Sequence, residues 1–533
     1  MPRARFISFQ EVGPLIPDNA VLSVSSSSAL ACPDATLKAI GDYYRQAGGP
    51  HGLTSIHPIA AGDMYGIAGV DYLAQPGLLR RVVAGSLPSG PSSMASPEIW
   101  KMIIEDRIEA YNLPSGIIFH MHREGAARRP GILSKVGLNT FVDPRLQGGA
   151  MNKSTPKDYV QLTEFRGEEW LFYPAISPNV AIIRGTTADE RGNISMENEG
   201  AYLGALDQAI AARNAGGIVI AQVKRLCANG TLKPQAVRIP GILVDYVVVD
   251  PEQKQTTQTV YDPAISGEIF RPESSFKETE WGLDKVIARR AAMELIQDDA
   301  VNLGFGISAL VPRILLEEGL HGEVTWVIEQ GAVGGMPLLG FAFGCASNAD
   351  AIMASPDQFT YFQGGGFDRS YLSFLQVDGE GNVNVSRLAA RPHVTAGAGG
   401  FIDITAHAKA IVFCGYFTAG GLDQQIEAGQ LRIRKEGKSR KFVEQVEHVT
   451  FSGKRAREQK QEVLYVTERA VLKLEPEGLT VIEIAPGIDL DRDVLQQADT
   501  TLRVSPKLKV MNGKLFEPGK FGLQLRRRPR GCG

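Results

Sequence analysis

Residues 179–187 read NVAIIRGTT, and residues 216–223 read GGIVIAQV. Their apolar residues are continuous rather than alternating, which is typical of strands buried on both faces of a sheet. Between them, the stretch from about 205 to 215 contains LDQAIAARNA, a pattern that predicts a crossover helix ending at Gly216. A strand, a helix and a second strand in this order predict an α/β fold.

Three further apolar runs of this kind lie along the chain, at 241–250, 323–331 and 410–418. At 533 residues the chain is too long for a single hydrophobic core. We therefore expect two domains, and the polar stretch at 266–281 is the best candidate for the linker between them. The boundary is placed near residue 280, so that the first domain spans 1–280 and the second 281–520.

A short internal repeat accompanies this division. DERGNIS at 189–195 resembles DGEGNVN at 378–384, and an apolar strand follows each copy at a similar distance. Two unrelated Asx-Gly turns are the alternative explanation. The matched strands favour the interpretation that the two domains are a duplication built on one plan.

Composition and charge exclude several classes of function. A formal net charge of −3 and a pI near 6.3 give no reason to expect a nucleic-acid surface. No window approaches the roughly 18 unbroken apolar residues of a membrane span, and the N-terminus lacks the apolar core of a signal peptide. The basic cluster Arg526, Arg527, Arg528 and Arg530 predicts a disordered, solvated tail at 521–533.

The cysteines and histidines indicate neither disulfides nor a metal. The five cysteines are scattered and never spaced as C-x-x-C, which favours a reducing, cytoplasmic location. His120 and His122 alternate as on a strand and could share one face with a metal ion. Because no third ligand is near, we interpret them as polar strand residues and expect no metal.

The segment most informative about chemistry is VTWVIEQGAVGGMP at 324–337. A hydrophobic strand ends in Glu329 and a glycine-rich turn follows, at the sheet edge where α/β proteins bind ligands. Taken alone, such a glutamate is more often a hydrogen-bonded structural acid. Two more glycine-rich turns, GGGFD at 364–368 and GAGGF at 397–401, favour a catalytic role, because such turns expose backbone N–H groups that can stabilise an oxyanion.

Many segments of the chain resemble class I coenzyme A transferases of the acetate/propionate and 3-oxoacid type. In chain order they are REGAARRPG (123–131), VGLNTFVDPR (136–145), RGTTADERGNISMENE (184–199), EQGAVGGMP (329–337), QGGGFD (363–368), LQVDGEGNVNVSRL (375–388), GAGGFIDI (397–404), ERAVLKL (468–474) and EIAPGIDLDRDVL (483–495). The resemblance implies two tandem, related α/β domains with the active site at their interface. The first would form the acyl and carboxylate side, and the second would carry the nucleophile and the coenzyme A site.

The resemblance also assigns roles to individual residues. It places Glu329 at the family's nucleophile position, and Gly399 and Gly400 in the turn whose backbone amide helps to form the oxyanion hole. Where the family has Pro-Gln-Gly, with the glutamine amide as a second donor, this chain has Ser115 in the central position. We expect the shorter serine to make a weaker oxyanion contact.

Two other segments depart from the family pattern. MPLLGFAF at 336–343 is bulkier than expected beside the nucleophile and predicts a reshaped acyl pocket. The four serines at 25–28 stand where a Gly-Gly turn often appears.

Coenzyme A carries phosphates, so cationic and polar groups are expected along its path. We assign Gly364, Gly365, Gly366, Asn384, Lys438 and Lys441 to this site, with Asp368 as a further residue that could line it. The basic run at 435–441, which contains the two lysines, could instead be a solvated loop.

The implied reaction moves coenzyme A from an acyl-CoA to a carboxylic acid by a ping-pong mechanism, as in short-chain fatty acid metabolism. Glu329 would pass through an acyl-glutamyl anhydride and a glutamyl-CoA thioester. A carboxylate is ionised near neutral pH, so the nucleophile should need no general base. The alternatives are an acyl-CoA hydrolase on the same site, or a non-catalytic sensor of acyl-CoA or phosphosugars.

The expected partners are small molecules. They are acyl-CoA and carboxylate substrates, with no permanently bound cofactor, no nucleic acid and no membrane. We expect the protein to be a homo-oligomer, either a dimer or a tetramer.

Overall fold

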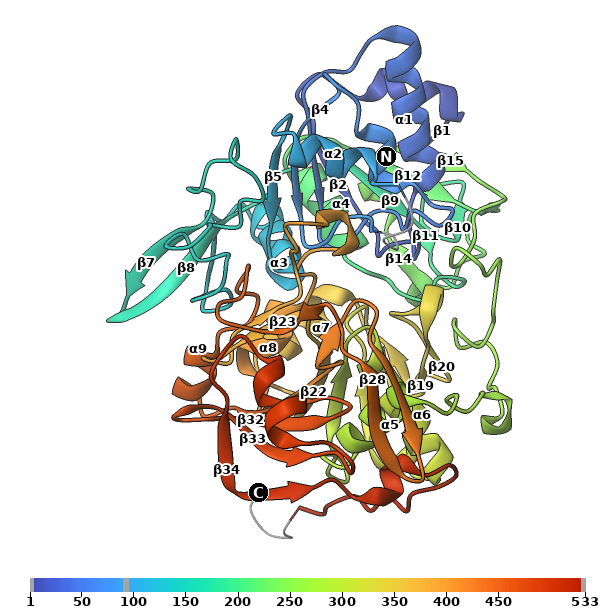
Figure 1. Ribbon diagram of the computed structural model, residues 1–533. Helices are drawn as coiled ribbons and strands as arrows, with labels where there is room; N and C mark the ends of the chain where they lie inside the picture. The colour runs from blue at the N-terminus through green and yellow to red at the C-terminus, as the bar shows by residue number, and fades with distance from the viewer. Residues whose placement is uncertain (1–3, 90–94, 529–533) are drawn as a thin grey trace.

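The computed structural model describes residues 4–89 and 95–528, which form two α/β halves, one above the other in Figure 1. Eight strands make the sheet of the upper half, and every neighbouring pair is parallel. In spatial order they are β1 (Arg5–Phe6), β15 (Tyr246–Val249), β12 (Ile218–Val223), β9 (Val180–Arg184), β2 (Val21–Val24), β3 (Leu53–His57), β4 (Leu79–Ala84) and β5 (Glu109–Asn112).

The sheet of the lower half has ten strands. In spatial order they are β21 (Ala351–Ile352), β18 (Ala332–Val333), β17 (Thr325–Val327), β16 (Ala300–Leu303), β22 (Arg369–Ser373), β25 (Ala410–Cys414), β31 (Glu462–Val466), β32 (Ala470–Glu475), β33 (Gly478–Ile484) and β34 (Arg503–Val510). The five strands from β17 to β31 are parallel, and antiparallel strands extend both sides.

Helices cover these sheets. Those of the first half are α1 (Asp34–Ala47), α2 (Glu98–Ile104), α3 (Ser115–Ala126) and α4 (Ala205–Asn214). Those of the second half are α5 (Leu283–Ala292), α6 (Val311–Glu318), α7 (Ser355–Gln363), α8 (Phe401–His407), α9 (Gly453–Glu458) and α10 (Leu490–Asp493). The predicted crossover helix is α4. Every residue of the central strands β9 and β25 is buried, as their continuous apolar pattern predicts.

One predicted strand is shorter than its sequence run. Within 241–250 only β15 is extended, because residues 241–243 form a 3₁₀ turn. The prediction that His120 and His122 lie on a strand was wrong, because both lie on helix α3. Their ring nitrogens contact protein groups: His122 pairs with the Ser23 hydroxyl at 2.8 Å, and His120 with the Thr360 hydroxyl at 3.1 Å.

The two halves share one plan, which confirms the duplication. Spatial order β15-β12-β9-β2-β3 in the first sheet corresponds to β31-β25-β22-β16-β17 in the second, and all of these neighbouring pairs are parallel. In each half the repeated motif forms a small antiparallel pair, β10 (Thr187–Asp189) with β11 (Ile194–Ser195) and β23 (Gln376–Asp378) with β24 (Val383–Asn384). A third strand joins each pair in parallel, β13 (Arg225–Cys227) in the first half and β30 (Phe442–Val443) in the second.

The repeated aspartates make the same hydrogen bonds. Asp189 accepts the backbone N–H groups of Arg191 and Asn193 and the side-chain amide of Asn193, at 2.8–2.9 Å. Asp378 accepts the corresponding three groups of residues 380 and 382 at 3.0–3.1 Å. The repeated sequence motif therefore forms the same turn in both halves, and in each turn one carboxylate accepts the hydrogen bonds of the loop.

The interface between the halves is apolar and continuous with the core of the second half. Phe119 of α3 packs against Phe359 of α7 with their ring centroids 5.7 Å apart, and Leu203 joins the same buried cluster. Between β24 and α8, the segment that contains the 3₁₀ turn Pro392–Val394 rises from the lower half toward α2 of the upper half (Figure 1). The Leu87 N–H donates to the Ala396 carbonyl at 2.7 Å across this junction.

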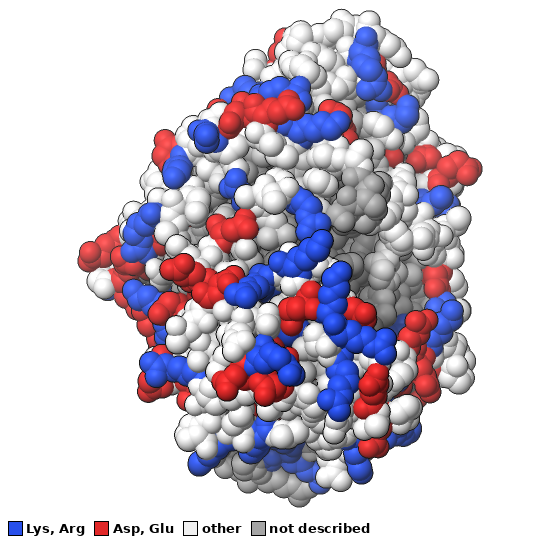
Figure 2. Space-filling model, in the orientation of Figure 1, with Lys and Arg blue, Asp and Glu red and all other residues white. Residues whose placement is uncertain are grey.

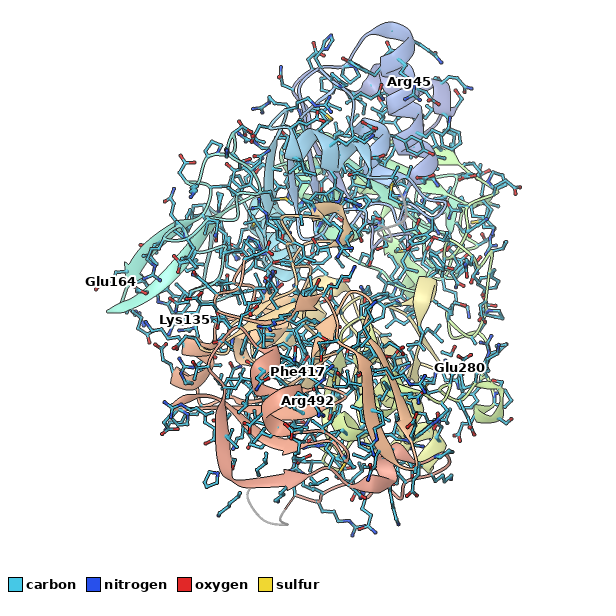
Figure 3. All side chains as sticks on the ribbon, viewed as in Figure 1. Arg45, Lys135, Glu164, Glu280, Phe417 and Arg492 are labelled. Carbon is cyan, nitrogen blue, oxygen red and sulfur yellow. The ribbon has the colours of Figure 1, made fainter. Side chains whose placement is uncertain are left out.

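A three-stranded sheet projects from the first half. It consists of β6 (Gly131–Ser134), β8 (Glu168–Pro174) and β7 (Gln161–Phe165), and the β7–β8 hairpin forms the arm at the left of Figure 1. Glu164 lies near its outer end and Lys135 near its base (Figure 3). Lys and Arg side chains are interspersed with Asp and Glu over the face seen in Figure 2.

The segment joining the halves has no strand between β15 and β16, and α5 begins at Leu283. The boundary near residue 280 remains a prediction; Glu280 lies on this segment (Figure 3). Among the residues that the structure describes, no helix is both long and apolar enough to cross a membrane.

The C-terminal segment differs from the predicted solvated tail. Arg526 pairs with Glu294, and Arg528 pairs with both Asp299 and Asp368 at 2.7–2.8 Å. Residues 521–528 therefore lie against the second half, because carboxylates on its surface match their charges. Arg530 lies outside the described residues.

The duplicated turn can be tested through stability. Asp189→Ala and Asp378→Ala should each lower the thermal midpoint, because each removes a buried carboxylate that accepts three hydrogen bonds within its turn, and one such bond contributes about 0.5–1.5 kcal/mol. Glu190→Ala, an exposed change in the same turn, is the matched control and should have little effect. Equal midpoints for the aspartate variants and this control, measured by calorimetry, would contradict the proposed structural role.

Candidate active site

Glu329 lies at the tip of the hairpin that joins β17 to β18. The Ile328 N–H donates to the Ala332 carbonyl at 2.8 Å, and the Gly331 N–H donates to the Ile328 carbonyl at 2.9 Å. This closes a tight turn with Glu329 and Gln330 at its centre. The turn requires glycine at 331, where φ is +124° and an added Cβ would lie 2.1 Å from the Met353 carbonyl oxygen. The carboxylate is thus fixed at the carboxyl end of a central strand.

The carboxylate of Glu329 lies directly against Gly400, the residue before α8. A Cβ added at Gly400 would be 2.7 Å from the Cδ of Glu329 and 2.7 Å from the ring of Phe359. The Gly400 backbone is close enough to favour the charged form of the carboxylate. Only glycine lets the backbone come this close. The 397–401 turn thus contacts Glu329, and the oxyanion role of Gly399 and Gly400 remains a prediction.

A second carboxylate, Asp403, lies in the first turn of α8 and is fully buried. Its Oδ2 accepts the Gly116 N–H at 3.0 Å, and its Oδ1 accepts the side-chain amide of Gln363 at 2.8 Å. Gly116 belongs to the first half, where it is the second residue of α3. Asp403 therefore links the start of α3 to α7 and α8 beside the nucleophile candidate.

The charge of Asp403 affects the ionisation of Glu329. Burial, followed by the nearby Asp403 charge, raises the pKa of Glu329 to about 8. Burial raises the pKa of Asp403 to about 7, although its hydrogen-bond donors favour the charged form. The expectation that Glu329 is simply ionised near neutral pH is therefore not met, because burial and the Asp403 charge favour its protonated form.

Loops of the first half complete the surroundings of the carboxylate. The Gly399 N–H donates to the Gly85 carbonyl at 2.7 Å, and the Gly399 carbonyl accepts the Ser115 N–H at 2.9 Å. The Asn112 side chain accepts the Ala398 N–H at 2.9 Å and donates to the Gly85 carbonyl. The 397–401 turn is thus held between two strand-end loops of the other half.

The serine segment at 25–28 also reaches the site. The side-chain amide of Gln330, next to the nucleophile candidate, donates to the Ser27 hydroxyl at 3.2 Å. Ser27 follows β2, a central strand of the first sheet, so both sheets present strand ends to the same place.

Ser115 begins α3 and is completely buried. Its hydroxyl has no protein partner, and a Cβ added at Gly85 would lie 2.2 Å from it. The hydroxyl therefore faces the Gly85 loop, and Gly116 rather than Ser115 donates a hydrogen bond to Asp403. Its role as an oxyanion donor remains a prediction.

The glycines 364–366 do not lie with Glu329. They follow the C-terminal end of α7 and precede β22, whereas Glu329 follows the parallel strand β17, so they occupy the opposite edge of the sheet. Gly364 caps the helix and Gly365 takes φ +70° beside the carbonyl of His407. These glycines form the turn that ends a helix. They do not lie beside Glu329, where their assignment to the coenzyme A site would require them.

Asn384 and Asp368 are likewise committed to other contacts. Asn384 is fully buried, donates to Gln376 and to the Arg387 carbonyl, and accepts the N–H groups of Ser386 and Arg387. No hydrogen-bonding capacity of this side chain is left for a ligand. Asp368 pairs with Lys409 and Arg528 at the edge away from Glu329.

Of the two predicted lysines, Lys438 lies on the surface and Lys441 points into the interior. Lys438 is exposed, but Lys441 reaches inward over the ring of Phe374, with Nζ 4.2 Å from its centroid. Burial lowers the pKa of Lys441 to about 8, and the charge of Glu468 opposes that shift. Lys441 lines a cavity of about 670 Å³ together with Trp281 and Tyr416. The solvated-loop interpretation therefore holds for Lys438 and fails for Lys441.

Four functional candidates escaped the sequence interpretation: Asp403, Gln330, Asn112 and Phe359. Asp403 and Gln330 lie inside motifs that were recognised, GAGGFIDI and EQGAVGGMP, so position next to the assigned residues could have indicated them. Nothing in the sequence indicates that Asn112 and Phe359 meet the site, because their contacts cross between the halves.

The site is thus a strand-end carboxylate enclosed between two related α/β halves, and comparisons with known proteins agree. The Coenzyme A transferase family model matches residues 40–250. The chain is 44% identical to the caffeate CoA-transferase of Acetobacterium woodii, over 98% of this chain and 99% of that protein. It is 41% identical to the acetate CoA-transferase YdiF of Escherichia coli K12, over 98% and 97% respectively.

A solved structure agrees in fold over the whole length. The thioester complex with CoA of the acyl-CoA transferase YdiF from E. coli O157:H7 matches with a TM-score of 0.90 and 39% identity, over 99% of this chain and 98% of that one. This chain therefore belongs to the coenzyme A transferase family. It is an enzyme that transfers coenzyme A between an acyl-CoA and an acid, which rules out the sensor alternative.

The raised pKa of Glu329 gives a prediction about stability and pH. In the unfolded chain its pKa is about 4.3, so between pH 4.5 and 8 the folded state binds more protons and loses stability as pH rises. Glu329→Gln cannot titrate, so its thermal midpoint should exceed that of the wild type by an amount that grows from pH 5.5 to pH 8.5. Scanning calorimetry without ligand measures this difference.

Glu280→Gln, on the exposed joining segment, is the control for removing one charge far from the site. A Glu329→Gln advantage that stays constant or shrinks with rising pH would contradict the assignment of a raised pKa.

Proposed function

We propose that Glu329 is the nucleophile of a ping-pong transfer of coenzyme A between carboxylic acids. The observation that carries this proposal is the position of its carboxylate, fixed at a hairpin tip between the two halves and touching a backbone N–H donor. Nucleophilic carboxylates act by forming covalent intermediates that divide one difficult step into two easier ones.

The steps balance as follows. The Glu329 carboxylate adds to the thioester carbonyl of the acyl-CoA, and the thiolate leaves, which gives an acyl-glutamyl anhydride. The thiolate then adds to the glutamyl carbonyl and the first acid leaves as a carboxylate, which gives a glutamyl-CoA thioester. The acceptor carboxylate runs these two steps in reverse. The YdiF structure described as a thioester complex with CoA supports such an intermediate.

Gly400 supplies the donor for the glutamyl oxyanion in this proposal. Its backbone lies directly against the Glu329 carboxylate, so its N–H can serve the oxygen that becomes negative when the thiolate adds. One such donor is worth about 2.7–4 kcal/mol in an acyl-transfer transition state. Gly399 supports it through the bonds that fix the turn to the first half.

Asp403 acts on the nucleophile through charge. Its proximity makes the Glu329 carboxylate less stable in the resting enzyme, and this penalty disappears when Glu329 becomes a neutral anhydride or thioester. Part of the cost of forming the acyl-enzyme is thereby offset by relief of repulsion.

The cavity beside Lys441 is the proposed path of coenzyme A. It lies beyond the carboxyl end of β25, the sheet edge that also carries Glu329, and its volume of about 670 Å³ suits an extended ligand. Lys441 supplies a positive charge within it, and Lys438 lies on the neighbouring exposed turn. Coenzyme A enters here only as a substrate, with no permanently bound cofactor.

We further propose that the enzyme works in the cytoplasm as a homo-oligomer. The four cysteines in the described part of the chain are free thiols, which fits a reducing compartment. The acids named for its relatives are caffeate and acetate, so the acceptor proposed here is a carboxylic acid of that broad class.

Covalent trapping tests the mechanism. Incubation with acyl-CoA alone should load coenzyme A onto Glu329, and borohydride, which reduces thioesters but not carboxylates, should then inactivate the enzyme. Peptide mass analysis should find the reduced residue at position 329, and an acceptor acid added first should protect it. A hydrolase would discharge the thioester with water, so protection by the acceptor would be absent.

Glu329→Gln is the control, because it removes the nucleophile and keeps the size of the side chain. It should show no adduct and should lose transfer by several orders of magnitude. Borohydride insensitivity of active wild-type enzyme after acyl-CoA would overturn the proposed mechanism.

Ser115→Ala separates a direct donor from a packing residue. Since its hydroxyl is buried without a partner, we expect a loss in kcat/KM well below the roughly 10²–10³-fold typical of a direct oxyanion donor, with thermal stability unchanged or higher. A loss of 10²-fold or more in steady-state kinetics would show that the hydroxyl reaches the oxyanion.

A further inference from the structure

Four aromatic rings form two edge-to-face pairs at the junction of the halves. Phe305, which follows β16 and is 65% exposed, meets Phe343 edge to face with centroids 5.4 Å apart. Phe341 meets Tyr65 of the first half edge to face at 4.7 Å, and Tyr65 is 47% exposed. We call these four residues the aromatic row. Phe341 and Phe343 lie in the hairpin between β19 (Met336–Pro337) and β20 (Ala346–Ser347), which Figure 1 shows at the junction.

Phe305 and Phe343 lie near the turn that holds Glu329. Strands β16 and β17 are parallel neighbours with Asn302 opposite Val327, so Phe305 and Glu329 both follow the carboxyl ends of adjacent strands, at the same edge of the sheet. A Cβ added at Gly344, the residue after Phe343, would lie 2.7 Å from the side chain of Gln330. The hairpin that carries Phe343 therefore packs against the residue next to Glu329.

The chemistry of this surface selects one kind of ligand. Large rings left open to water gain free energy when an apolar group covers them, and ring edges and faces favour a planar partner. An acidic side chain lies near one end of the row, because Asp63 accepts the backbone N–H of Tyr65 at 2.9 Å. A second carboxylate on the acyl group would meet repulsion there.

We propose that the aromatic row is the acyl-binding surface and that the preferred acyl groups are apolar monocarboxylates with a planar aryl or alkenyl skeleton, rather than dicarboxylates. This rests on the proposed function, since it takes Glu329 as the point of attachment. An acetyl group is too small to cover rings on this scale, so it gains little from them.

The test compares acyl-CoA donors with acetate as the common acceptor. The wild type should rank cinnamoyl-CoA above butyryl-CoA and both above succinyl-CoA in kcat/KM. Phe343→Ala and Phe305→Ala should each lower kcat/KM for cinnamoyl-CoA by roughly tenfold, the factor expected when about 50 Å² of apolar contact is lost. With acetyl-CoA as donor, and propionate as acceptor, the same changes should cost about twofold or less.

Two further variants make the result specific. Phe343→Leu keeps an apolar side chain in the hairpin and removes the ring, so it should reproduce the loss of selectivity even if the alanine variant is unstable. Phe270→Ala, 75% exposed on the joining segment, is the control and should leave all donors unchanged. Equal losses for every donor, or a preference for succinyl-CoA, would overturn the proposal and leave the row as hairpin packing.

Borohydride trapping in the same samples distinguishes a failure of the acyl-surface proposal from a failure of the proposed nucleophile. If coenzyme A is trapped at Glu329 while the ring variants keep the wild-type ranking, the acyl-surface proposal alone is wrong. If active wild-type enzyme gives no trapped adduct with any donor, the proposed nucleophile is wrong and the acyl-surface proposal falls with it.

Discussion

The hydrogen bond from the Gly116 N–H to the buried carboxylate of Asp403 is the contact on which the geometry of this site depends. It crosses from the first half of the chain to the second and ends on a group within the electrostatic reach of Glu329. A buried acid without donors would be strongly destabilising, so Asp403 constrains the halves to stay together. Burial and the charge of this acid together raise the pKa of Glu329, the proposed nucleophile, so the docking of the halves also sets the ionisation of Glu329.

The duplication allows equivalent positions of the two halves to be compared, and they differ at the strand end that carries Glu329. In the first sheet Leu22 pairs with Val180, and in the second Val301 pairs with Arg369, at corresponding distances from the repeated aspartates. On the next strand of each sheet, the same number of residues counted from these pairs leads to Pro58 in the first half and to Glu329 in the second. Pro58 therefore occupies the position that corresponds to Glu329. Its carbonyl oxygen would lie 2.0 Å from a Cβ at Gly85, so this strand end is packed against the loop that holds Gly399.

Both halves therefore use the carboxyl ends of their parallel strands, but for different purposes. The second half contributes the two buried acids, and the first contributes the Gly85 and Ser115 backbone groups and the Asn112 side chain that fix the 397–401 turn. Such an arrangement suits catalysis, because backbone donors held by a rigid framework need no reorganisation when charge develops. It also carries a cost in stability, since two acids are held close together and largely out of water.

The sequence by itself determined the fold class, the duplication and the candidate nucleophile. Continuous apolar strands, a crossover helix and the repeated aspartate turn are local patterns, and EQGAVGGMP is a contiguous motif, so neighbouring residues carry the information. Local patterns did not predict roles that depend on contacts between residues far apart in the chain. The glycines at 364–366 look like a ligand turn but lie at the far edge of the sheet, because strand direction sets which edge a loop occupies. Only the tertiary structure brought Gly116, Asp403 and Glu329 together, since burial and like charge arise between segments that are far apart in the chain and meet only when the two halves dock.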